Sequence, residues 1–231
     1  MIGYIGIFRN PTPVCWAGDM TMCYRGWPFL ESHQLLSDLL KWYYQIELGC
    51  YVHQLMWTEV GRKDSTEMII HHVATIFLVM WSWCANLTRI GTVTMFLHDL
   101  SDIFLESAKC INYASLSKGR KWLSSYCDGT FAVFAITFFV TRLYYFPRYC
   151  VFGFIFDAPR AFNDRTDWYG YKIFGALLTT LQVLHIFWFY LIAKMIYGLM
   201  KKGEVEGDVR SDAEDEDDTW TPEKDDGKKG K

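Results

Sequence analysis

Residues 71–113 read HHVATIFLVMWSWCANLTRIGTVTMFLHDLSDIFLESAKCINY. Most of this stretch is apolar, and it is long enough to pass twice through a lipid bilayer. It nevertheless contains adjacent histidines, two aspartates, a glutamate and a lysine. A charged side chain inside a membrane costs roughly 2.5–3.5 kcal/mol or more, and such residues usually mark a functional site. The stretch therefore predicts a polar site enclosed by membrane-spanning helices.

The composition agrees with a membrane protein that ends in a polar tail. Of the 231 residues, 51% are hydrophobic and 18% are aromatic. Residues 203–231 carry 12 acidic and 5 basic side chains, a net charge of −7, whereas the whole chain has a net charge of −3. Residues 1–202 therefore carry about +4. The high charge and low hydrophobicity of the tail predict that it is solvated and disordered.

Five stretches have the length and composition of membrane-spanning helices, and none alternates as a membrane β-strand does. A sixth stretch is short and is interrupted by Pro147. We therefore expect an all-α, polytopic membrane protein with five to six transmembrane helices. These helices would occupy residues 32–202, after an interfacial segment at residues 1–31 and before the tail at residues 203–231. The six stretches are residues 35–57, 68–86, 90–109, 122–141, 146–156 and 173–193.

Lysines near the C-terminus predict the orientation of the chain. Lys194, Lys201 and Lys202 follow the last predicted span, and basic residues favour the cytosolic side of a membrane. We therefore expect a cytosolic C-terminus. Lys228 and Lys229 stand fourth and third from the end. This spacing matches the dilysine signal for retrieval to the endoplasmic reticulum, so we expect the protein in that membrane.

Two polar stripes are expected on neighbouring helices, because a helix turns by about 100° per residue. Together the two stripes predict a shared polar interior. His72 lies about 100° around the helix from His71, so the two rings are expected to have different tasks. The first stripe contains His71, Thr75, Ser82, Asn86 and Arg89, and the second contains His98, Asp99, Asp102, Glu106 and Lys109.

The order of these residues resembles the signature of the ceramide synthases within the TLC-domain family. The matching positions are His71-His72, Ser82, Asn86, Arg89, Gly91, LHD at 97–99, Asp102, LESAK at 105–109 and Asn112-Tyr113. The similarity extends upstream to RKD at 62–64, and downstream to Arg142, Pro147 and the acidic run at 208–217. It implies a TLC-type helical barrel. Ceramide synthases usually carry a further transmembrane helix before this region, and we expect this extension to be missing here.

The resemblance implies transfer of a fatty acyl group from acyl-CoA to the amine of a sphingoid base, sphinganine or sphingosine, giving dihydroceramide or ceramide. This amine is mostly an ammonium at neutral pH, so a base must remove its proton, and histidine titrates in the useful range. In a second route a histidine first attacks the thioester and forms an acyl-imidazole. Both routes stay open. The alternative function is a non-catalytic lipid-binding or chaperone protein of the same family.

The resemblance also suggests roles for individual residues. We expect His71 to be the base or nucleophile and His72 to be its partner. The catalytic group would be completed by His98, Asp99 and Asp102, since a carboxylate can orient an imidazole. The residues expected to bind substrate are Ser82, Asn86, Arg89, Lys109 and Asn112, where Arg89 could meet the CoA phosphates. Ser211 precedes an acidic run and is expected to be phosphorylated by an acidophilic kinase.

No metal and no cofactor are expected; acyl-CoA is counted as a substrate. The seven cysteines are odd in number and form no C-x-x-C pair, which argues against a zinc site and a disulfide framework. The six histidines form no H-x-x-H-H box, which argues against a di-iron hydroxylase or desaturase and against a fatty-acid elongase. Expected partners are fatty acyl-CoA, a sphingoid base, the lipid bilayer and other ceramide synthases in a homo- or heterodimer, but no nucleic acid.

Overall fold

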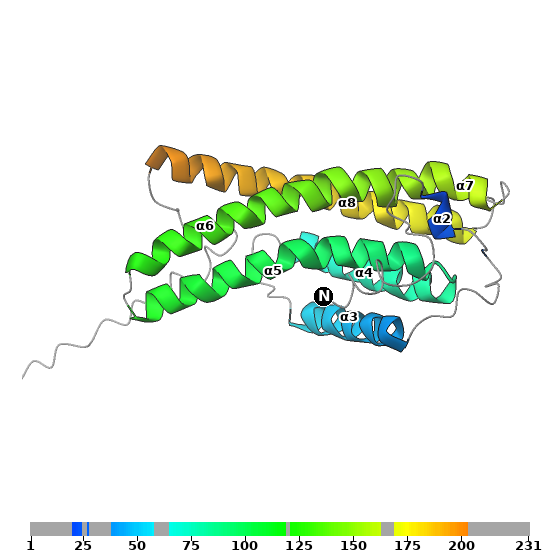
Figure 1. Cartoon of the computed structure of the whole chain (residues 1–231), viewed down its shortest axis with the longest axis horizontal. Coiled ribbons are helices and arrows are strands. Elements are labelled where there is room, and N and C mark those ends of the chain that lie inside the picture. Colours follow the sequence, from blue (N-terminus) through cyan, green and yellow to red (C-terminus); the bar gives the residue numbers. More distant parts are fainter. Residues whose placement is uncertain are drawn as a thin grey trace, which may run out of the picture.

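The computed structural model is a bundle of long helices that run along one common direction (Figure 1). It describes residues 20–24, 27, 38–57, 65–118, 121–162 and 169–202. No strand occurs among these residues, so the predicted all-α fold is confirmed. The elements are α2 (Thr21–Tyr24), α3 (Asp38–Met56), α4 (Ser65–Cys84), α5 (Thr88–Lys118), α6 (Lys121–Phe138), η1 (Phe139–Val151), η2 (Gly153–Asp157), α7 (Ala158–Ala161) and α8 (Tyr169–Lys202).

The central position in the bundle belongs to α4 and α5. On one side they pack against α8 and η1, and on the other side α3 lies along α4 (Figure 1). Buried apolar side chains fill both contacts, for example Leu78, Leu97 and Leu178 towards α8, and Leu40 and Val79 towards α3. Side chains on the inner faces of α4 and α5 are therefore enclosed by helices from distant parts of the sequence.

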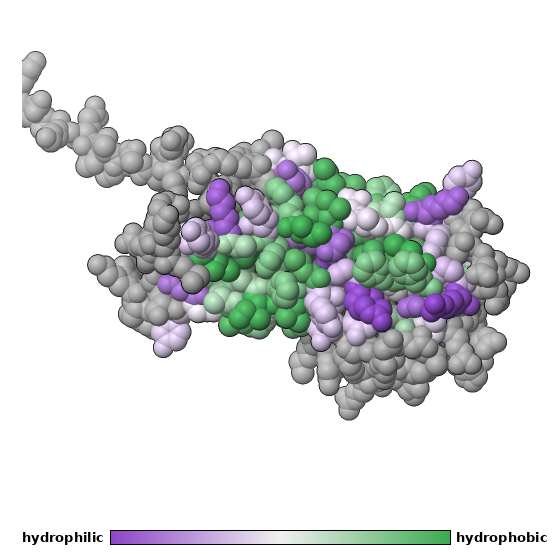
Figure 2. Space-filling view, turned by 90° about the horizontal axis from the view of Figure 1, so that it is seen from above, coloured by the Kyte–Doolittle hydropathy of each residue, from purple (hydrophilic) through white to green (hydrophobic). Residues whose placement is uncertain are grey.

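Within the described part of the chain, three helical segments are long and apolar enough to cross a membrane: Ser65–Cys84, Tyr126–Ala161 and Tyr169–Gly198. Their outer faces expose large apolar side chains such as Phe77, Ile136 and Ile186. Figure 2 shows apolar side chains gathered over the central part of one face. Helices α3 and α5 have 19 and 31 residues but carry more charge, so their passage through the membrane stays a prediction.

Pro147 does not separate two spans, and the prediction of a separate short helix at residues 146–156 is wrong. Residues 126–161 form one helical segment of 36 residues. Pro147 lies inside η1, which is π-helical, and the Phe152 N–H donates to the Pro147 carbonyl five residues earlier. A proline is tolerated within a spanning helix when local π-type adjustment re-satisfies the backbone. The result is a long helix that reaches from α6 to α7.

The first polar stripe is shorter than predicted. Asn86 has a φ of 60° and lies in the turn after α4, a conformation that asparagine adopts more readily than most residues. Arg89 consequently belongs to α5, so Asn86 and Arg89 do not continue the helix face of His71. Thr75 and Ser82 do share that face, and both are buried with His71.

Helix α5 approaches its neighbours closely at Gly91. A Cβ atom at this position would clash with the Tyr44 hydroxyl and would lie 2.6 Å from Ser82 Oγ.

The predicted segment before residue 32 is described only at residues 20–24 and 27. The basic link at 62–64 and the tail with Ser211 lie outside the described residues.

Candidate functional site

Four buried histidines from three helices gather at the centre of the bundle. His71 and His72 come from α4, His98 from α5 and His185 from α8, and each is at most 6% exposed. The His71 ring centroid lies 5.5 Å from that of His72, 6.0 Å from that of His98 and 6.3 Å from that of His185. The fold therefore brings histidines from three helices into one group, and the His71 ring lies near each of the other three rings.

Hydrogen bonds define the tautomers of two neutral rings in this group. His98 Nδ1 lies 2.7 Å from the Thr94 carbonyl oxygen, which can only accept, so Nδ1 carries a hydrogen. His98 Nε2 is then an acceptor, and it lies 3.0 Å from His185 Nε2. His185 must donate through this nitrogen. A directed chain thus runs from His185 through His98 to the backbone of α5.

Three ring nitrogens are buried without a hydrogen-bond partner among the described residues. They are Nδ1 of His71, of His72 and of His185. Leaving such an atom unpaired typically costs about 1–3 kcal/mol. Unsatisfied polar atoms in a folded protein often indicate a reactive or ligand-binding role. The histidine group therefore retains nitrogen atoms that can still exchange protons or bind a substrate.

Arg142 joins η1 to the carboxylate side of the site. Its side chain is buried, and it donates through Nε to Ser101 Oγ at 3.0 Å and through Nη2 to the His98 carbonyl at 3.2 Å. Nη2 also forms an ion pair with Asp102 Oδ1 at 2.5 Å, and the guanidinium lies 5.0 Å from the ring centroid of Phe138. Arg142 thereby fixes the part of α5 that carries both His98 and Asp102.

Helix α3 supplies tyrosines to the other side of the site. The Tyr43 hydroxyl donates to Asp99 Oδ2 at 2.5 Å. The Tyr51 ring centroid lies 6.4 Å from that of His72. His72 therefore faces α3, whereas His71 faces α8 and packs edge-on against Trp188 at 5.0 Å. The two adjacent histidines thus have different surroundings, and the expectation that they have different tasks stays a prediction.

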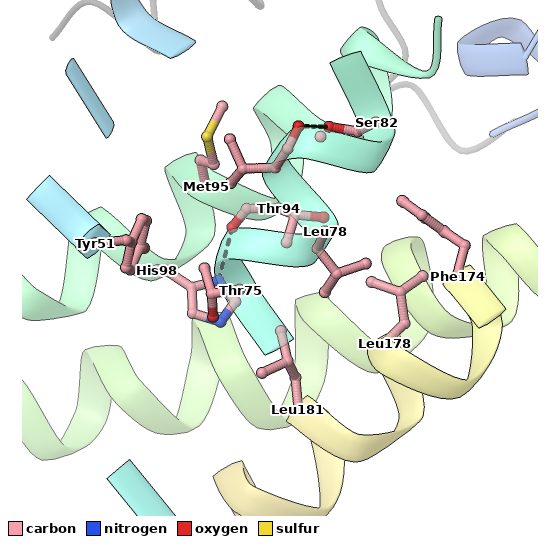
Figure 3. Close-up of a pocket in the computed structure, with 12 residues that line it drawn as sticks. Tyr51, Thr75, Leu78, Ser82, Thr94, Met95, His98, Phe174, Leu178 and Leu181 are labelled. Atoms are coloured by element: carbon pink, nitrogen blue, oxygen red, sulfur yellow. Dashed lines mark hydrogen bonds between the residues drawn. The ribbon is translucent and has the colours of Figure 1, made fainter. Parts of the chain in front are cut away.

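A narrow cavity extends from His98 between α4, α5 and α8 (Figure 3). Tyr51, Thr75 and His98 line one part of it, and Phe174 and Leu178 of α8 line another. The space accessible to water centres is about 10 Å³, which corresponds to about one water molecule. A ligand larger than a water molecule would have to separate the helices to occupy this cavity.

Comparison with known proteins is consistent with this geometry. The family model described as TLC domain matches residues 1–194. Ceramide synthase 4 of Mus musculus is 38% identical over 204 residues, which cover 87% of this chain and 48% of that protein. Ceramide synthase LOH2 of Arabidopsis thaliana is 38% identical over 219 residues, covering 92% of this chain and 69% of that protein.

The chain belongs to the ceramide synthase group of the TLC-domain family. A more distant relative, ceramide synthase hyl-2 of Caenorhabditis elegans, is 31% identical over 208 residues, covering 86% of this chain and 60% of that protein. The chain spans about half the length of the mammalian ceramide synthases that it matches.

The structure places the other predicted site residues of this TLC domain at different depths. Ser82 is fully buried and donates to the Val79 carbonyl at 2.9 Å. Arg89 is half-buried at the start of α5. Lys109 is exposed and pairs with Glu106 at 2.8 Å, and Asn112 is also exposed. The second polar stripe thus enters the interior only as far as Asp102, and Lys109 and Asn112 lie apart from the histidines.

Three contributors to the TLC-domain site were not selected as site residues from the sequence. His185 was left out, although it is the only histidine in an otherwise uncharged predicted span at residues 173–193. Arg142 was noticed only through the family resemblance. Tyr43 gave no signal because its partner Asp99 is 56 residues away. Among the described residues, no group of three or more His, Cys, Asp or Glu side chains is arranged to hold a metal ion.

Proposed function

We propose that this protein is an N-acyltransferase that moves a fatty acyl group from acyl-CoA to the amine of a sphingoid base, giving ceramide or dihydroceramide. The observation that carries the proposal is the buried histidine group, which Arg142 borders and in which His71, His72 and His98 lie together. Relatives named ceramide synthase match most of the chain. Acyl transfer to an amine needs a proton acceptor in a site from which water is excluded, and buried imidazoles can supply one.

In the proposed reaction the substrate ammonium first loses a proton to a histidine, and the electron pair stays on the amine nitrogen. That nitrogen attacks the thioester carbonyl, the C–S bond breaks, and the CoA thiolate takes the first proton back from the histidine. The attacking nitrogen then loses its second proton to the same histidine, which releases it to solvent, and the neutral amide remains. His71 is the base in this route, with His72 as its partner. In the covalent route, His71 attacks the thioester first, CoA leaves, and the amine then releases the acyl group from the imidazole.

Both substrates must reach the histidines from the bilayer. Small-molecule pockets usually measure roughly 300–1,000 Å³, far more than the present cavity. We therefore propose that the acyl chain enters between α4, α5 and α8 and displaces side chains such as Phe174 and Leu178. The CoA head group would stay near a membrane surface, where Arg89 could bind its phosphates.

The wider context of the protein is also proposed. The chain would be a multi-pass protein of the endoplasmic reticulum membrane with a cytosolic C-terminus, and it would form homo- or heterodimers with other ceramide synthases. Lys194 and the lysines that follow it support this orientation. A glycosylation site engineered into the tail would test it, since only a luminal tail would be modified.

Microsomes that contain the full chain provide the main test. They would be supplied with labelled sphinganine and acyl-CoAs of several lengths. Amide formation should fall by roughly 10²–10⁴-fold in His71→Ala, in line with the usual contribution of general acid–base catalysis. His53→Ala is the matched control, because His53 is an exposed histidine on α3, and it should retain the rate.

Two outcomes would contradict the proposal. One is a wild-type chain that forms no amide with any acyl-CoA, and the other is full activity in both His71→Ala and His72→Ala at equal abundance. Binding of sphinganine without amide formation would favour the non-catalytic alternative. The two chemical routes differ in mass: intact-protein mass spectrometry after acyl-CoA alone should show an acyl adduct in the covalent route and none in the direct route.

A further inference from the structure

Three carboxylates from two helices lie close together beside His72. Asp99 and Asp102 come from α5, and Glu47 comes from the neighbouring α3. Glu47 shares one face of α3 with Tyr43 and Tyr51, which lie four residues before and after it. Tyr43 donates to Asp99, and the Tyr51 ring centroid lies 6.4 Å from that of His72. All three residues are only half-buried, in contrast to the fully enclosed histidines. The group therefore forms an accessible acidic edge of the histidine site.

Among the described residues, the positive charge that pairs with this acidic edge is smaller than its negative charge. Arg142 is the cation that pairs with it among the described residues, and its bond goes to Asp102. Asp99 has a neutral partner, the Tyr43 hydroxyl. Ionised side chains inside a membrane normally pair with one another. Three carboxylates beside one guanidinium thus leave room for a further cation.

A second, independent feature points to a ligand at the same place. His72 is 4% exposed, and its Nδ1 has no hydrogen-bond partner among the described residues. Asp102 acts on this ring electrostatically. Tyr51, which contacts the His72 ring, also interacts with the charges of Glu47, Asp99 and Asp102. A buried imidazole nitrogen without a partner among the described residues is therefore enclosed next to the acidic edge.

We propose that Glu47 and Asp99 form a binding site for the ammonium group of the sphingoid base, adjacent to His72. This inference rests on the proposed function and adds a residue of α3 that lies outside the histidine signature. The carboxylates would hold the amine in its cationic form. With His72 beside the ammonium as the partner of the base, a proton then moves from the ammonium nitrogen to His71, and the electron pair stays on the amine for attack on the acyl group.

The site explains how a charged head group could enter an apolar bundle. Asp102 is held by Arg142 on the η1 side, so the charge that remains available lies towards α3. Helix α3 packs along α4 next to the adjacent histidines (Figure 1). A long-chain base could therefore bring its ammonium to the acidic edge while its hydrocarbon chain stays in contact with lipid or with apolar helix faces.

The test measures binding separately from turnover. Purified full-length chain in lipid nanodiscs would be titrated with radiolabelled sphinganine and with octadecane-1,2,3-triol, in which a hydroxyl replaces the amine. Wild type should bind sphinganine at least tenfold more tightly than the triol. Glu47→Gln should lose most of this preference, whereas Glu47→Asp, which keeps the charge, should retain part of it.

Asp38→Asn is the matched control. Asp38 is a carboxylate on the same helix, but it is exposed at the N-terminus of α3 and pairs with Lys41, so its loss should leave the preference unchanged. Glu47→Gln removes a charge that is costly in a membrane, so normal folding is expected and would be checked by the amount of monodisperse protein. In microsomes the KM for sphinganine should rise about tenfold in Glu47→Gln, with little change in the KM for acyl-CoA.

The outcomes separate this inference from the proposed function. Equal binding of sphinganine and triol by wild type would overturn the ammonium site, whatever the activity. An unchanged preference in Glu47→Gln would exclude Glu47 from the site. If wild type prefers sphinganine and Glu47→Gln loses that preference, but no amide forms with any acyl-CoA, then the ammonium site stands and the acyltransferase proposal fails.

Discussion

Replacement of Arg142 by methionine should destabilise the bundle by about 2–3 kcal/mol. The side chain is buried and makes three hydrogen bonds, one of them within an ion pair with Asp102. Breaking a fully buried ion pair costs about 3–5 kcal/mol, whereas an exposed pair contributes about 0–1 kcal/mol. The Asp102 side chain is 47% exposed, so the expected loss lies between these limits.

The assay is thermal unfolding of the purified chain in detergent, followed by tryptophan fluorescence. For a protein of this size, 1 kcal/mol shifts the midpoint by roughly 2–4 °C, so Arg142→Met should lower it by roughly 5–10 °C. Arg148→Met is the matched control from the same segment: Arg148 is exposed and lies over the Tyr149 ring at 5.7 Å. It should shift the midpoint by under about 2 °C.

A double variant tests the stated cause. If the penalty arises from the charge left on Asp102, then Asp102→Asn in the Arg142→Met background should recover part of the lost stability, although the same change in wild type is destabilising. Equal midpoints for Arg142→Met and Arg148→Met would refute the structural role assigned to Arg142. A double variant with simply additive losses would refute the ion pair as its basis.

Three further changes have defined outcomes. Gly91→Ala should lower the free energy of unfolding by about 1–3 kcal/mol through overpacking, which would be measured as a lower unfolding midpoint. Gly49→Ala is its control, because nothing lies within 4 Å of the Cβ atom added there. Equal midpoints for the two variants would contradict the close packing of α5 at Gly91. Tyr43→Phe removes the hydrogen bond to Asp99. If that bond contributes about 1 kcal/mol, the affinity for sphinganine should fall by roughly 3- to 10-fold. An unchanged affinity would show that the bond does not hold the Asp99 carboxylate in place. His185→Phe removes the donor to His98, and turnover in microsomes should fall by roughly tenfold at a similar unfolding midpoint; an equal loss of stability and activity would assign it to packing alone.

Local sequence pattern was sufficient to predict the part of the site that lies within one helix. His71, Thr75 and Ser82 follow a helical period, and the structure buries all three on one face. The same reasoning failed at Asn86 because it assumed an unbroken helix. Asparagine is a common residue just after a helix end, and its positive φ starts a turn there. The stop signal was present in the sequence, but the polar periodicity obscured it.

The misplaced end of a span has a different physical cause. A proline inside a helix normally ends or kinks it, yet η1 continues through Pro147 with π-type hydrogen bonding. The identity of a single residue does not predict whether a helix continues through a proline with π-type hydrogen bonds. His185 shows a further limit: it is 87 residues from His98, and only the packing of α8 against α4 and η1 brings the two rings together. Contacts of this kind depend on the whole bundle and have no local signature.

Arg142 and the unpaired histidine nitrogens are expected to have different roles in the site, one structural and the other chemical. Arg142 already donates to the His98 carbonyl, Ser101 and Asp102, so its main contribution is to hold α5 in place. The histidine nitrogens without partners are instead available for proton transfer. Changes at Arg142 should therefore reduce stability and activity together. A change at His71 should remove activity while leaving the fold as stable as before or more stable, because an unsatisfied buried atom is lost with it.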